Sequence, residues 1–229
     1  RSALPARSEM CIRDSYYMVE RSIRPWSVTE PSLLAALNQI PREKFFPQDQ
    51  QDLVYAEITL PLANGGMAVE PRYMARLIQA LNLDASKNVL EIGTGSGYAT
   101  AVLARLAQHV DTLDIDEQQI TQAQNILRTL EFNNISYYKG DGFNQEVYAK
   151  VKNNYDAIYF GGAIHTLPAF VFDALKIDGL LIAVLGNITP NQAIRYRKHS
   201  DGSISSETLF EMQLPFLTQT NRLPLPFEF

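Results

Sequence analysis

The sequence predicts an α/β fold with a mostly parallel central sheet and helices on both faces. From residue 72 to residue 185, short apolar runs alternate with stretches whose apolar residues recur at helical spacing. This alternation is typical of parallel sheets, whose strands are buried on both sides. A glycine turn, Gly93–Gly97, directly follows the first apolar run. Two extended stretches around Asp201-Gly202 predict a C-terminal antiparallel hairpin at the sheet edge.

The expected elements follow the chain in order. Strands are predicted at residues 88–92, 110–114, 135–139, 155–160 and 180–185, with helices at 72–82, at 97–107, after Asp116 as N-cap, and at 167–175. An earlier helix has Thr29 as its candidate N-cap, Pro31 in its first turn and Pro41 at its end. Residues 53–66 show neither the helical nor the strand spacing of apolar residues, so an extended loop is expected there.

The length of the chain suits one domain with one sizeable core. Of 229 residues, 46% are hydrophobic and 20% are charged, which are ordinary values for a globular protein. We divide the domain, 16–229, into a helical lead-in and loop (16–70), a core (71–186), and a hairpin and tail (187–229). Residues 1–15 look like translated sequencing adaptor and are left out of the fold argument; a natural disordered N-terminus is the alternative.

Composition argues against several classes of function. The formal net charge is -5 and no basic block is present, so no nucleic-acid surface is expected. No apolar run approaches the roughly 18 residues of a membrane span. The single cysteine, Cys11, allows no intramolecular disulfide, and a cytoplasmic location is expected. Three scattered histidines offer no metal-site spacing, so no metal is expected.

The glycine turn indicates a cofactor site. Its spacing is G-x-G-x-G, whereas the dinucleotide fingerprint that cradles a pyrophosphate is G-x-G-x-x-G. Glu91, two residues before Gly93, would repel a pyrophosphate. It would suit a cofactor that is cationic at this point, such as S-adenosylmethionine with its amino group and sulfonium.

Further candidates lie where the next strands end, which is where open α/β sheets place their ligands. Asp114 can accept hydrogen bonds from two ribose hydroxyls; its rival, Asp116, is better placed as a helix cap. Asp141, between two glycines, can accept from the adenine amine, and Gly161 leaves space for the reacting methyl. The predicted S-adenosylmethionine site comprises Glu91, Gly93, Thr94, Gly95, Ser96, Gly97, Asp114, Ile115, Asp141, Gly142 and Gly161.

These motifs carry a family resemblance. Residues 89–107, 140–142 and 155–158 closely resemble protein-L-isoaspartate O-methyltransferases, and residues 18–47 are similar to a bacterial branch of that family. The resemblance implies a Rossmann-like methyltransferase fold, a monomer, and methylation of isoaspartyl carboxylates for protein repair. Such a carboxylate is already ionised at pH 7, so no catalytic base is expected. The methyl ester then collapses to a succinimide.

One segment departs from the family pattern. Where the family has a serine at its active site, this chain has Val69, and Glu70 adds a negative charge beside it. Arg72 offers a cation for a substrate carboxylate, and His165 is a candidate base for a phenol or amine. The predicted substrate-side residues are Val69, Pro71, Arg72 and His165.

The departure leaves alternatives open. In one alternative to a damaged protein or peptide, the substrate is a small molecule. An apolar pocket walled by Val69 and Trp26, with His165 near the methyl group, would favour that alternative. In another, the chain binds S-adenosylmethionine without catalysis.

Overall fold

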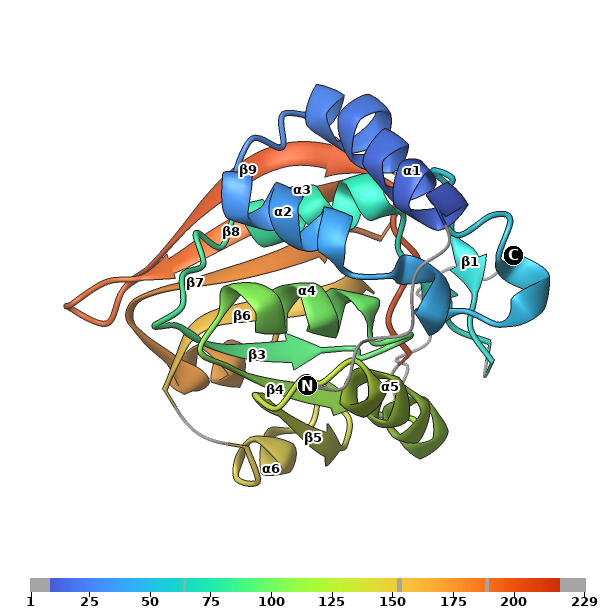
Figure 1. The fold of residues 1–229 in the computed structure, drawn as a ribbon. Coiled ribbons are helices and arrows are strands. Elements are labelled where there is room, and N and C mark those ends of the chain that lie inside the picture. The colour runs from blue at the N-terminus through green and yellow to red at the C-terminus, as the bar shows by residue number, and fades with distance from the viewer. Residues whose placement is uncertain (1–8, 64, 152–153, 188–189, 219–229) are drawn as a thin grey trace, which may run out of the picture.

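The computed structural model describes residues 9–63, 65–151, 154–187 and 190–218. Within these ranges a mixed seven-stranded sheet has the order β5-β4-β3-β6-β7-β8-β9, with helices on both of its faces (Figure 1). Five strands run parallel: β3 (Asn88–Ile92), β4 (His109–Asp114), β5 (Ile135–Lys139), β6 (Tyr155–Ile164) and β7 (Leu175–Leu185). The antiparallel strands β8 (Asn191–Lys198) and β9 (Ile204–Met212) form the predicted hairpin at the edge. The predicted fold class is confirmed.

The α-helices of the described part are α1 (Glu9–Tyr17), α2 (Pro31–Gln39), α3 (Pro71–Gln79), α4 (Tyr98–Leu106), α5 (Glu117–Thr129) and α6 (Gln145–Tyr148). Short 3₁₀ or π turns are η1 (Met18–Ile23), η2 (Arg24–Trp26), η3 (Arg42–Phe45), η4 (Gln48–Gln50) and η5 (Ala169–Ala174). A small ladder pairs β1 (Leu60–Pro61) with β2 (Met67–Ala68) inside the predicted loop. None of the described helices has the length and apolar character needed to cross a membrane.

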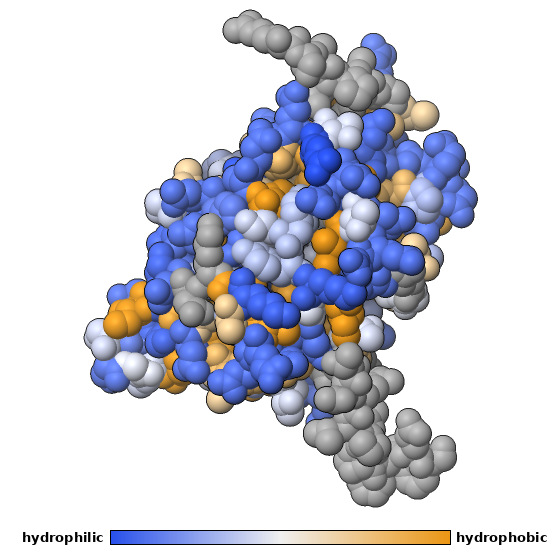
Figure 2. All heavy atoms as spheres, turned by 90° about the horizontal axis from the view of Figure 1, so that it is seen from below, coloured by the Kyte–Doolittle hydropathy of each residue, from blue (hydrophilic) through white to orange (hydrophobic). Residues whose placement is uncertain are grey.

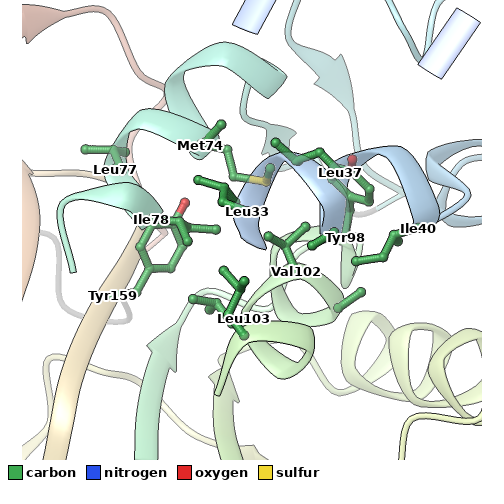
Figure 3. Packing of buried hydrophobic residues seen from close by; sticks show 14 of the residues in the cluster. Leu33, Leu37, Ile40, Met74, Leu77, Ile78, Tyr98, Val102, Leu103 and Tyr159 are labelled. Carbon is green, nitrogen blue, oxygen red and sulfur yellow. The ribbon is translucent and has the colours of Figure 1, made fainter. Parts of the chain in front are cut away.

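The core lies on both faces of the sheet, because alternate residues of each strand point to opposite sides. Val89 belongs to the cluster under α2, α3 and α4, whereas Leu90 belongs to the cluster under α6 and η5. Figure 3 shows Leu33 of α2 gathered with Met74 of α3 and Val102 of α4 in the first cluster. On the face seen in Figure 2, hydrophilic residues predominate and hydrophobic ones form small groups among them.

Some predicted helix signals were wrong. Glu30, not Thr29, is the N-cap of α2, and no side chain caps it; Pro31 at the first position sets the start instead. The expected helix at 167–175 is only the 3₁₀ turn η5. Asp116 does cap α5, since its side chain accepts from the backbone N–H groups of Gln118 and Gln119.

The described part of the N-terminal stretch is helical. Residues 9–15 are helical within α1, and Ser15 is buried, its Oγ 3.2 Å from the carbonyl oxygen of Asn38. Met10 and Ile12 are exposed, so this helix buries few apolar side chains, in line with the lack of an apolar period in its sequence. The proposed adaptor origin of residues 1–15 stays a prediction, and residues 1–8 lie outside the described residues.

The predicted tail returns to the sheet. The Ala163 N–H donates to the carbonyl of Pro215 at 2.8 Å, and the Leu217 N–H donates to the carbonyl of Ala163 at 2.9 Å. This parallel bridge holds residues 215–217 beside the end of β6. Residues 219–229 of the predicted tail lie outside the described residues.

Candidate active site

A cavity of about 150 Å³ lies at the carboxyl ends of β3, β4, β5 and β6, where open α/β sheets bind ligands. A second, smaller cavity adjoins it and shares Gly93, Gly95 and Gly161 with it. We call the first the cofactor cavity and the second the acceptor cavity. Of the predicted cofactor residues, the cofactor cavity is lined by Gly93, Gly95, Asp114, Ile115, Gly142 and Gly161, and the acceptor cavity also by Thr94 and Ser96.

The glycine turn needs its glycines for conformation and for space. Gly97 has a φ of 85°, which side-chain-bearing residues rarely adopt. A Cβ on Gly97 would lie 2.8 Å from the Cβ of Ala123, so the glycine lets α4 begin directly against α5. A Cβ on Gly161 would lie 2.7 Å from the carbonyl oxygen of Gly93. The backbone after β3 therefore approaches β6 closely at Gly161 and leaves a surface of bare backbone between the two cavities.

Asp114 has the geometry expected of a ribose ligand. One carboxylate oxygen accepts from the Gly95 N–H at 3.0 Å and the other from the Asp116 N–H at 2.9 Å. A carboxylate offers about four acceptor positions, so these backbone bonds leave capacity for a further donor. Burial raises the pKa of Asp114, and these backbone N–H donors lower it again. Asp114 lines the cofactor cavity, where its carboxylate can accept from a hydroxyl of a bound ligand.

Glu91 does not reach either cavity wall. It lies on the α4 side of β3, fully buried, and its Oε2 accepts from the hydroxyls of Thr100 at 2.5 Å and Thr112 at 2.7 Å. Burial raises the pKa of Glu91 to about 8, so the side chain is protonated at neutral pH. The expected negative charge beside the cofactor is therefore replaced by a neutral group that ties β3 to β4 and α4.

Asp141 also acts from outside the cavity wall. Its Oδ1 accepts from the Phe143 N–H at 2.9 Å, which shapes the turn after β5. The wall at this point consists of Gly140, Gly142 and Phe143. The structure thus presents an aromatic face and bare backbone where the sequence placed the Asp141 carboxylate.

The substrate-side residues divide into two groups. Val69 lines the acceptor cavity, and Pro71 is the buried first residue of α3 next to it. Arg72 faces away, since its guanidinium pairs with Glu70 at 2.8 Å and with Glu57 at 3.4 Å. It also lies 4.5 Å from the ring centre of Trp26. Arg72 and Glu70 therefore neutralise each other outside both cavities.

His165 does not point to the predicted methyl position. Its ring stacks on Phe216 at 4.3 Å between centroids, and its Nδ1 lies 3.2 Å from Oδ1 of Asn187. Neither His165 nor Trp26 is among the residues lining the two cavities.

Sequence reasoning missed part of the cofactor cavity wall. Leu217 and Phe216 line it because the chain returns beside β6, and a Cβ on Gly93 would lie 2.8 Å from the Leu217 side chain. No local sequence pattern predicts that residues 216 and 217 return to β6. Gln119 lines the cavity from the first turn of α5. Its position three residues after the N-cap Asp116 could have predicted that it lies near the cofactor cavity.

Comparisons with known proteins agree with this geometry. A family model described as protein-L-isoaspartate(D-aspartate) O-methyltransferase matches residues 15–223. A protein-L-isoaspartate O-methyltransferase of Picosynechococcus is 34% identical over 184 residues, covering 80% of this chain and 82% of the relative. One from Aliivibrio salmonicida is 32% identical, covering 86% of this chain and 92% of the relative.

A solved structure supports the fold. An isoaspartate methyltransferase structure from Plasmodium falciparum, in complex with S-adenosyl-L-homocysteine, superposes with a TM-score of 0.73 at 18% identity. The superposition covers 91% of this chain and 98% of that one. The family model spans nearly the whole described chain and the relatives exceed 30% identity, so this chain belongs to the protein-L-isoaspartate(D-aspartate) O-methyltransferase family.

Proposed function

We propose that this chain transfers a methyl group from S-adenosylmethionine to the free carboxylate of isoaspartyl residues in damaged proteins or peptides. The observation that carries the proposal is the pair of adjoining cavities. They meet at Gly93, Gly95 and Gly161, so a cofactor in one lies next to an acceptor in the other.

The residues of the cofactor cavity fit S-adenosylmethionine. Asp114 would accept from the ribose hydroxyls, while Ile115 and Phe143 offer apolar surface to the adenine. Gly93 and Gly161 line the cavity with bare backbone, which would face the methionine part of the cofactor. When bound, the cofactor supplies an electrophilic methyl group and departs as S-adenosylhomocysteine.

The chain's own contribution is alignment. An acceptor carboxylate is ionised at pH 7 and needs no base to attack the methyl group. The protein holds the acceptor beside the cofactor and so converts a bimolecular step into an intramolecular one. Val69 adds shape but no hydrogen bond at the position where the family has serine.

The small-molecule alternative loses the two features that would favour it. Trp26 packs edge-on against Tyr73 at 5.5 Å, and His165 stacks on Phe216. An apolar pocket walled by Val69 and Trp26 is therefore not formed among the described residues.

We extend the proposal to a cytoplasmic monomer made of one domain, 16–229. The single cysteine of the sequence supports the reducing compartment. The continuous sheet from β5 to β9 supports a single folding unit. Light scattering coupled to size exclusion would give a mass near 25.8 kDa for a monomer, and twice that mass would contradict it.

Methyl transfer tests the proposed activity. The full chain would be incubated with labelled S-adenosylmethionine and an isoaspartyl peptide, with the normal aspartyl peptide as a matched control. Base-labile label on the isoaspartyl peptide alone is the expected result. Cofactor binding without transfer to either peptide would overturn the proposal and leave the non-catalytic alternative.

A further inference from the structure

A buried arginine borders the acceptor cavity. Arg42, the first residue of η3, is only 1% exposed and lines the cavity with Val69. Arginine is almost never fully buried unless it is paired. The guanidinium of Arg42 lies 4.6 Å from the ring centre of Tyr98 and 4.8 Å from that of Phe46. Two aromatic rings thus hold the orientation of this cation.

The hydrogen bonds of Arg42 are incomplete. Its Nε donates to the carbonyl oxygen of Val54 at 2.5 Å. Its Nη2 is buried and has no hydrogen-bond partner. A guanidinium carries five N–H donors and stays charged at all ordinary pH values. A buried cation with an unsatisfied donor at a cavity wall is costly unless an anion enters that cavity.

The carboxylate of Glu57 acts on Arg42 electrostatically but makes no hydrogen bond to it, and its Oε1 is buried without a partner. Glu57 is within electrostatic reach of Arg42, but its Oε2 lies 3.4 Å from Nε of Arg72. No ion pair joins Glu57 to Arg42 in the part of the chain that the structure describes. The positive charge of Arg42 is therefore not neutralised by direct contact.

The acceptor cavity suits a small anionic group. Its volume is about 40 Å³, and one water needs roughly 10–15 Å³, so a group of a few non-hydrogen atoms fits. Leu62, Val69 and Met74 contribute apolar surface to the wall, and hydroxyl-bearing residues also line it, namely Thr94, Ser96, Tyr98 and Tyr159. A carboxylate there would meet one cation and lie next to Gly93 and Gly161 at the cofactor boundary.

We propose that Arg42, the buried cation that lines the acceptor cavity, binds the acceptor carboxylate of the substrate through its guanidinium, whose Nη2 has no partner, and so selects a carboxylate over a neutral group. This inference rests on the proposed function for the identity of the substrate. It also accounts for a site that works with Val69, because the guanidinium provides the hydrogen bond that valine cannot.

The proposed role separates binding from turnover. The carboxylate loses its charge only when the new bond is complete, so an ion pair to Arg42 stabilises the bound substrate and the transition state nearly equally. Interactions of that kind lower KM without raising kcat. Arg42→Met, which keeps an apolar chain against the rings, should raise KM for the isoaspartyl peptide about 10- to 100-fold, as loss of a charged hydrogen bond implies. Its kcat should stay within about threefold.

Equilibrium binding provides the decisive readout. With S-adenosylhomocysteine present, binding of the isoaspartyl peptide would be compared with that of an isoasparaginyl peptide, whose acceptor is a neutral amide. The wild type should prefer the carboxylate by about tenfold or more, and Arg42→Met should reduce this preference to about twofold or less. Arg72→Met is the matched control, since Arg72 is already paired outside the cavities, and it should keep the wild-type preference.

The outcomes are separable. Equal binding of the two peptides by the wild type would overturn the inference even if Arg42→Met does not fold. An unchanged preference in a folded Arg42→Met protein would also overturn it. Arg42→Lys keeps the charge without the planar fork and should retain part of the preference. Carboxylate-selective binding without any methyl transfer would overturn the proposed function and still support the role of Arg42.

Discussion

Replacing Glu91 by glutamine is expected to remove a large part of the pH dependence of folding. Glu91 is buried beneath the glycine turn, where burial raises its pKa from the ordinary 4.5 to about 8. The folded protein holds this side chain protonated at pH 7, whereas the unfolded chain carries it ionised. The stabilising effect is complete below pH 4.5 and is lost as the pH rises toward 8, because only the unfolded chain releases the proton in that interval.

The size of the effect follows from the two pKa values. At 1.36 kcal/mol for each pKa unit, the difference between 4.5 and about 8 corresponds to about 5 kcal/mol over the full titration. Between about pH 5 and pH 7.5 the loss is about 3 kcal/mol, because part of the titration lies outside that window. Glutamine has the shape of the protonated carboxyl group and does not titrate, so Glu91→Gln should escape this loss.

Urea unfolding across this pH window, without cofactor, measures the difference. The unfolding free energy of Glu91→Gln relative to the wild type should rise by about 3 kcal/mol from about pH 5 to pH 7.5. Glu117→Gln is the control, since the Glu117 side chain is 70% exposed on α5, and its curve should run parallel to that of the wild type. A parallel curve for Glu91→Gln as well would refute the buried, protonated state.

Two further predictions concern the cofactor cavity and its turn. Asp114→Asn should weaken S-adenosylmethionine binding by about tenfold or more, because an amide offers only one acceptor oxygen. Asp116→Asn should bind the cofactor nearly as the wild type does, since asparagine caps a helix equally well. Calorimetric titration measures both affinities, and equal losses would contradict the separate roles of the two residues. Gly97→Ala should destabilise by about 2–4 kcal/mol, as both its φ and the nearby Ala123 oppose a Cβ. Gly202→Ala, with a similar φ but open space, should cost only about 1–2 kcal/mol by the same unfolding assay; equal costs would show that the packing of α4 on α5 does not need this glycine.

Much of the fold is predictable because its signals are local. The strands at 88–92 and 135–139 begin and end where the apolar pattern says, and the glycine turn follows β3 as expected. The Asp116 cap needs only the residues just after it. The prediction of an α-helix at 167–175 was wrong because local periodicity alone does not distinguish a 3₁₀ turn from a full α-helix.

The parts that sequence reasoning missed depend on contacts between distant segments. Arg72 looks like an available cation until Glu57, 15 residues earlier, is seen to face it. Leu217 reaches the cofactor cavity only because its backbone bonds to Ala163. Glu91 keeps its place near the turn, but burial between β4 and α4 removes its charge. A charged residue in a loop, such as Arg42, gives no sequence signal that it is buried.

Isomer-resolved chromatography of a peptide substrate tests the repair activity most directly. An isoaspartyl peptide would be held with the full chain and excess S-adenosylmethionine for many turnovers, and its aspartyl isomer would be measured over time. If the acceptor is the isoaspartyl carboxylate, the ester collapses to a succinimide and the aspartyl peptide accumulates only when enzyme and cofactor are both present. An isoaspartyl peptide that stays unchanged while the chain binds the cofactor would contradict this function.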